Sequence, residues 1–237
     1  MKIRIIYYFI IVFISLPSLL YGDNRSTFYG VAPKLTYLDP YTIISDKHLW
    51  RDIPSIDEDG RLNVIVEIPA GRTEKWEVRK EDGALVWDFK KGKPRVVKYI
   101  GYPGNYGMVP QTLLPKKFGG DGDPLDVIIL GPPILRGSIA KAKLIGVLKL
   151  LDGEEQDDKL ITVGKDSPFY KVDSLEELDE KFPGILIILE SWFLNYKGSG
   201  ETESRGFGGT DVAKSILSRA IDYYRSAVIE PTSEHKK

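Results

Sequence analysis

The pattern of apolar and polar positions predicts short β-strands in the first two thirds of the chain and helices in the last third. Residues 63–69 (NVIVEIP) alternate, so that Glu67 lies on the face opposite three aliphatic side chains. Residues 75–78 repeat the alternation, with Lys75 and Glu77 on one face. Further strands, rich in aliphatic residues, are predicted at residues 85–89, 127–130, 139–151 and 159–163.

Helical spacing comes late in the chain. Residues 174–177 (SLEE) form a capping box, which predicts a helix start. Residues 185–196 are long and apolar, with Gly198 as a stop, and residues 211–228 are amphipathic. Many short strands followed by terminal helices predict a mixed β/α fold, a small β-barrel buttressed by helices.

The remaining segments define how the domain is organised. Residues 101–107 (GYPGNYG) are predicted as a loop, and the Gly- and Ser-rich residues 198–209 as a mobile loop. We expect one domain over residues 23–237, with an N-terminal arm at residues 23–58 and a C-terminal helix at residues 210–229.

The first 22 residues differ in composition from the rest. Lys2 and Arg4 give a positive start, and residues 5–20 are almost wholly apolar. This pattern predicts a secretory signal peptide, cleaved after Gly22, and export to the periplasm, the medium or an organelle or secretory lumen. The alternative is an uncleaved membrane anchor, because the apolar run is long enough to span a bilayer.

Composition excludes several classes of chemistry. The 237 residues carry a net charge of −1, so no basic surplus indicates nucleic-acid binding. The absence of cysteine excludes disulfides, thiol catalysis and zinc–thiolate sites. The two histidines, His48 and His235, leave little material for a histidine-based triad.

The stretch 119–130 (GGDGDPLDVIIL) carries the clearest candidate chemistry. Asp121, Asp123 and Asp126 lie within six residues on a turn that Gly and Pro keep out of a helix, at the start of an apolar strand. Their mutual repulsion would be relieved by a divalent cation, and oxygen-only ligands favour Mg²⁺ over zinc. An acidic surface turn is the alternative. An EF-hand loop is excluded, because its twelfth position would be Pro132.

A second acidic turn, residues 152–159 (DGEEQDDK), also lies beside a strand end. With Asp152 and Asp157, the two turns could bring five carboxylates together around several metal ions. Basic and phenolic residues are scattered among the same elements: Lys75, Arg95, Tyr102, Tyr106, Lys159, Tyr196 and Lys197. Metals with Lys and Arg would hold a polyanion, for which phosphate is the obvious candidate.

These motifs also match a known family. DGDPLDV, with VEIPA upstream, PGNYG between and DxxxxDxK downstream, resembles soluble family I inorganic pyrophosphatase over residues 48–197. HLWRDIP and KKGKPR resemble its longer animal and fungal branch. The resemblance implies a five-stranded OB-like antiparallel β-barrel flanked by C-terminal helices. It also implies hydrolysis of pyrophosphate to two phosphates by metal-activated water, with several Mg²⁺ ions for which Mn²⁺ can substitute.

The resemblance further implies a role for each matched residue. Asp123 is expected to take the proton from the attacking water. The expected metal ligands are Asp121, Asp126, Asp152, Asp157 and Glu67. The expected phosphate contacts are Lys75, Arg95, Tyr106, Lys159, Tyr196 and Lys197. Glu77 and Tyr102 are expected to lie behind the residues that contact the substrate.

Two other functions are alternatives to this one. The first is a non-catalytic protein that binds metals or polyphosphate on the same scaffold. The second is an OB-type oligonucleotide binder, which the acidic clusters disfavour. We therefore expect pyrophosphate as partner, no nucleic acid, and membrane contact only if the N-terminal segment is retained. We also expect a homo-oligomer, of a size that the sequence does not give.

Overall fold

The computed structural model describes residues 34–198 and 200–229. The predicted signal peptide, residues 1–22, lies outside the described residues. Within the described part of the chain, no helix has the length and apolar character needed to cross a membrane.

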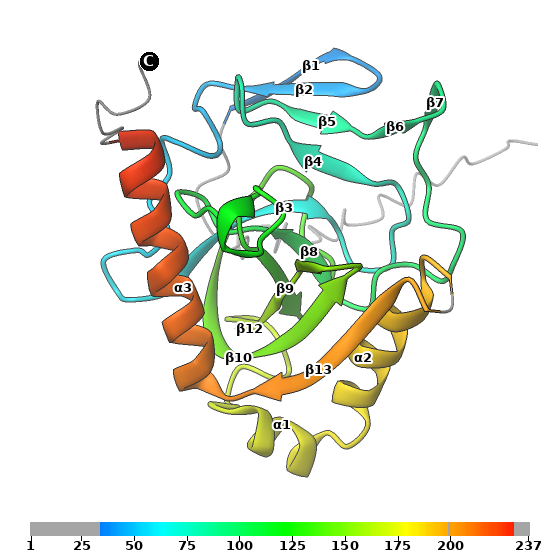
Figure 1. The fold of residues 1–237 in the computed structure, drawn as a ribbon, viewed down its shortest axis with the longest axis vertical. Coiled ribbons are helices and arrows are strands. Elements are labelled where there is room, and N and C mark those ends of the chain that lie inside the picture. The colour runs from blue at the N-terminus through cyan, green and yellow to red at the C-terminus, as the bar shows by residue number, and fades with distance from the viewer. Residues whose placement is uncertain (1–33, 199, 230–237) are drawn as a thin grey trace, which may run out of the picture.

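The centre of the molecule is formed by five strands, as can be followed in Figure 1: β3 (Leu62–Ile68), β8 (Asn105–Met108), β9 (Asp126–Leu130), β10 (Ile139–Asp152) and β12 (Lys159–Gly164). They pair in the order β10-β12-β9-β8-β3, and β3 also pairs with β10, so the pairings run around a closed ring.

One pairing in this ring corrects the predicted antiparallel sheet. β9 and β12 run parallel, whereas the other pairs in the ring are antiparallel. The reason is β10, the long strand that lies between β9 and β12 in the sequence. β12 turns back antiparallel to β10 and enters the ring beside β9 in the same direction.

A second, smaller sheet lies over one side of the ring (Figure 1). Its order is β1-β2-β5-β4, with β1 and β2 inside the predicted N-terminal arm. The bounds are β1 Leu35–Asp39, β2 Thr42–Ser45, β4 Trp76–Val78 and β5 Leu85–Trp87, followed by the hairpin of β6 Phe89–Lys90 and β7 Lys93–Pro94. Trp76 and Val78 are buried, which confirms the predicted two-faced strand and leaves Lys75 and Glu77 on the other face.

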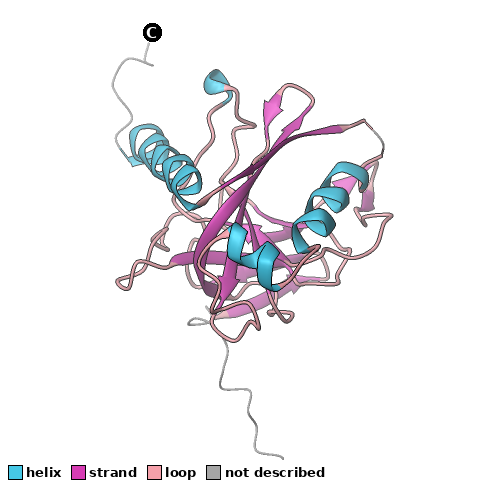
Figure 2. Cartoon of the chain, turned by 90° about the horizontal axis from the view of Figure 1, so that it is seen from below, coloured by secondary structure: helices cyan, strands magenta, loops and turns pink. Residues whose placement is uncertain are grey.

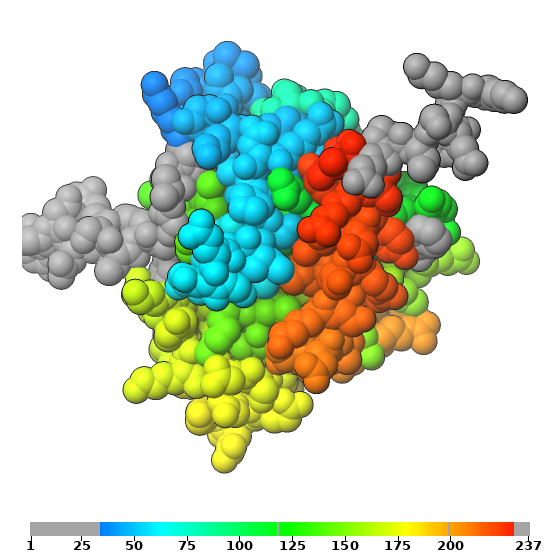
Figure 3. All heavy atoms as spheres, turned by 90° about the vertical axis from the view of Figure 1, so that its left-hand side faces the viewer, coloured from blue at the N-terminus to red at the C-terminus, as the bar shows by residue number. Residues whose placement is uncertain are grey.

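The helices lie on the outside of the strands (Figure 2). They are the 3-10 turn η1 Lys116–Phe118, α1 Leu175–Lys181, α2 Ile185–Asn195, and α3 Thr210–Tyr224, which continues into the π-helical turn η2 Arg225–Ile229. The helix start predicted from the capping-box pattern is confirmed, because the Glu177 backbone N–H donates to Oγ of Ser174 over 3.2 Å. The Glu177 side chain accepts from the Asp173 N–H, one residue before the expected partner Ser174. The end of α3 packs beside the segment that leads into β3 (Figure 3), with the Trp50 and Tyr224 rings 5.2 Å apart.

Two segments predicted as loops contain strands. Residues 198–209 include β13 (Thr202–Gly208), which pairs with β10. The end of β10 also pairs with the short strand β11 (Glu155–Gln156), which lies in the second acidic turn. Residues 101–107 overlap β8, which lies between β3 and β9. Gly107 permits this approach, since a Cβ atom there would lie 1.9 Å from the carbonyl oxygen of Ile65.

β3 is buried on both faces, which explains the environment of its glutamate. Val64 and Val66 pack in the core cluster that α3 covers, and Ile65 packs with Trp76 beneath the small sheet. Glu67 is therefore only 5% exposed, and the strand end that carries it opens onto a polar pocket instead of solvent.

Candidate active site

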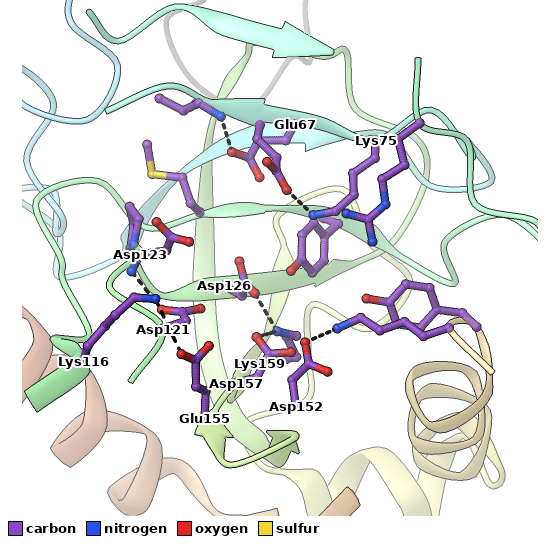
Figure 4. Close-up of a pocket in the computed structure, with 18 residues that line it drawn as sticks. Glu67, Lys75, Lys116, Asp121, Asp123, Asp126, Asp152, Glu155, Asp157 and Lys159 are labelled. Carbon is purple, nitrogen blue, oxygen red and sulfur yellow. Dashed lines mark hydrogen bonds and ion pairs between the residues drawn. The ribbon is translucent and has the colours of Figure 1, made fainter. Parts of the chain in front are cut away.

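A pocket of about 410 Å³ lies between the small sheet and one end of the central ring (Figure 4). Elements from across the whole fold contribute to it. Its lining residues are Glu67, Lys75, Glu77, Val78, Arg95, Tyr106, Met108, Lys116, Asp121, Asp123, Pro124, Asp126, Asp152, Glu155, Asp157, Lys159, Tyr196 and Lys197.

The first acidic turn, residues 121–126, is fixed by local hydrogen bonds. The Asp123 N–H donates to Oδ1 of Asp121 over 2.8 Å, which closes a turn around Gly122. Leu125 is fully buried and anchors the turn to the core. The three aspartates are thereby held at the start of β9 and line the pocket.

The second acidic turn, residues 152–157, is joined to the first by backbone contacts. The Gln156 N–H donates to the Gly119 carbonyl over 2.7 Å, and Gln156 forms a β-bridge with Gly120. The Asp157 N–H donates to the Leu150 carbonyl over 3.0 Å. The predicted convergence of two distant acidic turns is thus present in the fold (Figure 4).

Lysine ammonium groups lie among these carboxylates. Lys159, whose side chain is 2% exposed, donates to Asp126 over 2.5 Å and also to Asp157. Burial alone would lower the pKa of Lys159, but the charges of Asp126 and Asp157 outweigh it and raise the pKa. Lys197 pairs with Asp152 over 2.5 Å on the other side of the pocket.

The carboxylates perturb one another. Burial, reinforced by the charges of Asp126, Asp123 and Asp157, raises the pKa of Asp121 to about 6. The pKa of Glu67 is raised well above its ordinary value by burial, although its Oε1 accepts the Val78 N–H over 2.7 Å. Such shifts are typical of carboxylates arranged to hold a cation.

The far wall of the pocket is cationic and aromatic. Lys75 pairs with Glu77, and Arg95 donates Nη1 to Oδ2 of Asp88 over 3.0 Å. Burial raises the pKa of Tyr106 well above its ordinary value, so this phenol keeps its proton and is available as a hydrogen-bond donor. Tyr196 closes the same side, where its ring stacks on Trp192 of α2 at 4.5 Å.

The donor set fits a hard divalent cation. The pocket holds eight carboxylates and five cationic side chains, and His and Cys are absent from its lining. Within the described residues, no three Asp, Glu, His or Cys side chains are grouped closely enough to hold a metal ion in their present positions. Lys159 instead lies between Asp126 and Asp157, where its charge satisfies the oxygens that a cation would otherwise contact.

Thirteen of the fourteen residues singled out from the sequence line this pocket. Tyr102 does not; it is 3% exposed and lies behind Tyr106, at a ring distance of 5.0 Å. Glu77 lines the pocket directly, whereas the resemblance implied a place behind it. Sequence reasoning missed Lys116 and Glu155, which pair over 3.6 Å.

Comparison with known proteins agrees with the site. The family model for inorganic pyrophosphatase matches residues 64–225. The mitochondrial inorganic pyrophosphatase of Saccharomyces cerevisiae is 40% identical over 169 residues, which cover 62% of this chain and 54% of that protein. Soluble inorganic pyrophosphatase 2 of Chlamydomonas reinhardtii is 34% identical over 183 residues, which cover 75% of this chain and 88% of that protein.

Solved structures give the same result. The structure of inorganic pyrophosphatase from Schistosoma japonicum superposes with a TM-score of 0.72 at 28% identity, covering 78% of this chain and 75% of that one. Fold and pocket together define a protein that gathers acidic and basic side chains in one pocket. The chain belongs to the inorganic pyrophosphatase family.

Proposed function

We propose that this protein hydrolyses inorganic pyrophosphate to two phosphates with the help of bound Mg²⁺. The observation that carries the proposal is the composition of the pocket. Its eight carboxylates outnumber its five cationic side chains, so a polyanion would be repelled unless further cations entered with it. A carboxylate-rich pocket that nevertheless carries phosphate-binding Lys and Arg is suited to a substrate that arrives with metal ions.

The proposed residue roles follow the chemistry of each group. Asp121, Asp126, Asp152, Asp157 and Glu67 would hold several Mg²⁺ ions, for which Mn²⁺ could substitute. When bound, these ions supply positive charge that lowers the pKa of the attacking water and offsets the charge on the phosphates.

The protein's own side chains transfer the proton and bind the phosphates. Asp123 accepts the proton that the attacking water loses as its oxygen bonds to one phosphorus and the P–O–P bridge breaks. Lys75, Arg95, Lys159 and Lys197 bind the phosphate oxygens and stabilise negative charge on the leaving phosphate. Tyr106 and Tyr196 donate hydrogen bonds to the same oxygens.

Phosphate release from pyrophosphate tests the proposal. The purified protein is expected to release two phosphates per pyrophosphate with Mg²⁺, and none above the uncatalysed rate when Mg²⁺ is replaced by a chelator. Binding of pyrophosphate and Mg²⁺ without phosphate release would instead identify the non-catalytic binding protein. Triphosphate and ATP in the same assay would measure how far the pocket discriminates among phosphoanhydrides.

Further proposals concern the whole protein. We propose that the closed ring of five strands is an OB-like barrel, which its closing β3–β10 pairing supports. The yeast relative and the KKGKPR turn support a place in the animal and fungal branch. Export, after cleavage at Gly22, rests on residues 1–22, and N-terminal sequencing of mature protein would test it.

We also propose a homo-oligomer. Large apolar side chains such as Tyr37 and Leu38 are 66% and 67% exposed on β1, and their burial against a second copy of the chain would remove apolar surface from water. Light scattering during size exclusion would test this proposal, since a monomer at micromolar concentration would contradict it.

A further inference from the structure

Lys80 connects two parts of the site that are distant in sequence. It follows β4, in the turn that leads to β5, and reaches the first acidic turn 43 residues later. Its Nζ atom donates to the carbonyl oxygen of Gly122 over 2.7 Å and to Oδ1 of Asp123 over 2.5 Å. Lys80 itself does not line the pocket, whereas Asp123 does.

The backbone of Asp123 is already held, but its side chain is open to solvent. The N–H of Asp123 donates to Asp121, and its carbonyl accepts the Leu114 N–H over 2.9 Å. The carboxylate is 59% exposed, so little packing restrains its rotation. The ion pair with Lys80 fixes Oδ1 and leaves Oδ2 as the oxygen that can face the pocket.

We propose that Lys80 is a positioning residue, which orients the Asp123 carboxylate to take the proton from the attacking water. The inference rests on the proposed function. Proton transfer needs the acceptor within about 2.6–3.2 Å of the water oxygen, so a freely rotating carboxylate would spend much of its time out of reach. Because Lys80 lies outside the pocket lining, it affects the chemical step and leaves substrate binding unchanged.

The chain offers a closely matched control in Lys143. Its Nζ atom donates to the carbonyl oxygen of Tyr170 over 2.7 Å and to Oδ1 of Asp173 over 2.5 Å, which are the same distances that Lys80 makes. The Lys80 and Lys143 side chains are 35% and 29% exposed. Lys143 lies on β10, and neither it nor its partners line the pocket.

Steady-state kinetics of Lys80→Met and Lys143→Met at saturating Mg²⁺ test the inference. We expect kcat of Lys80→Met to fall about 10-fold to 100-fold with KM within about twofold of wild type, because misorienting a catalytic group can cost about 10²-fold. Lys143→Met is expected to keep both values. Lys80→Arg, which retains a donor, is expected to recover part of kcat. Equal kinetics for the two Met variants would overturn the inference.

A double-mutant cycle separates positioning from general stabilisation of the turn. If Lys80 acts through Asp123, Lys80→Met causes no further loss of kcat in the Asp123→Asn background. A full additional loss in that background would overturn the inference and assign Lys80 a structural role. A wild-type protein that releases no phosphate would overturn the proposed function and this inference together. An active wild type with an unaffected Lys80→Met overturns the inference alone.

Discussion

Lys159 donates a hydrogen bond to Asp126 over 2.5 Å, although the two residues are 33 positions apart in the sequence. The contact exists because β12 runs parallel to β9 with Lys159 directly beside Asp126 in the register. Lys159 also pairs with Asp157, so one buried ammonium bridges carboxylates from both acidic turns. The same oxygens would bind the metal ions in the proposed mechanism, which makes the lysine and the metal ions alternative partners.

Replacing Lys159 should destabilise the metal-free protein more than the protein with bound Mg²⁺. For Lys159→Met in a chelator, we expect the free energy of unfolding to fall by about 3–5 kcal/mol, because a buried charge loses its partner. With Mg²⁺ the loss should be smaller, since the ion supplies the missing charge. Denaturant unfolding in both buffers measures the difference. Lys181→Met, which breaks the exposed pair with Glu177, is the control and should change little in either. Equal losses for Lys159→Met in the two buffers would contradict the inference that Lys159 and the metal ions are alternative partners of the same carboxylates.

Arg95 should not tolerate replacement by lysine. One nitrogen of its guanidinium is held by Asp88, so its remaining donors are presented to the pocket in a fixed plane. We expect Arg95→Lys to lower kcat/KM by about 10-fold to 100-fold, since a hydrogen bond to a charged group is worth about 1.5–3 kcal/mol. Arg79→Lys, which alters the exposed pair with Asp82, should leave kcat/KM unchanged. An Arg95→Lys enzyme with wild-type kinetics would remove Arg95 from the phosphate contacts.

Gly107 should be among the least replaceable residues of the fold. A methyl group there would meet the Ile65 carbonyl at 1.9 Å and force β8 away from β3. We expect Gly107→Ala to lower the free energy of unfolding by about 3 kcal/mol or more. Gly209→Ala is a suitable control, because nothing lies within 4 Å of its added methyl group, and should cost less than about 1 kcal/mol. Comparable stability of the two variants would show that the strands can separate without cost.

The contribution of Asp57 to the free energy of unfolding should decrease as the pH falls below about 4. Burial would raise its pKa, but the Arg61 N–H and the Lys141 ammonium outweigh burial and lower it below the ordinary value of 3.8. The pair with Lys141, at 2.9 Å, therefore stabilises the fold above pH 4 and is lost as the pH falls through the lowered pKa. We expect Asp57→Asn to cost about 1 kcal/mol at pH 7 and to match wild type near pH 2. A pH-independent difference between the two proteins would refute this assignment.

The sequence predicted those parts of the site that local pattern determines. Alternation placed Lys75 and Glu77 on the face opposite Trp76, and the capping box located the start of α1. The Gly, Pro and Asp of residues 121–126 predicted a turn before a buried strand, as observed. Each of these features depends on neighbours within a few residues, so periodicity and turn chemistry were sufficient.

Features that depend on distant pairing were not predictable in this way. Residues 202–208 form β13 because β10 offers them a pairing edge, and their Gly-rich sequence gave no sign of it. Glu67, read alone, is a typical solvated strand residue; the small sheet and the ring bury it together. Lys80 contacts Asp123 only because the turn after β4 lies over the first acidic turn, which no local spacing reveals.

The two acidic turns share divalent cations in the proposed mechanism, and Mn²⁺ provides a direct test of this sharing. Crystals grown with Mn²⁺ and pyrophosphate, with fluoride to slow turnover, can be measured at the manganese absorption edge. We expect strong anomalous peaks in coordinating contact with Asp121, Asp126 and Asp157, with Lys159 shifted onto the phosphate oxygens. A pocket without such peaks, with Lys159 still bound to Asp126 and Asp157, would contradict the proposal that the two acidic turns share divalent cations.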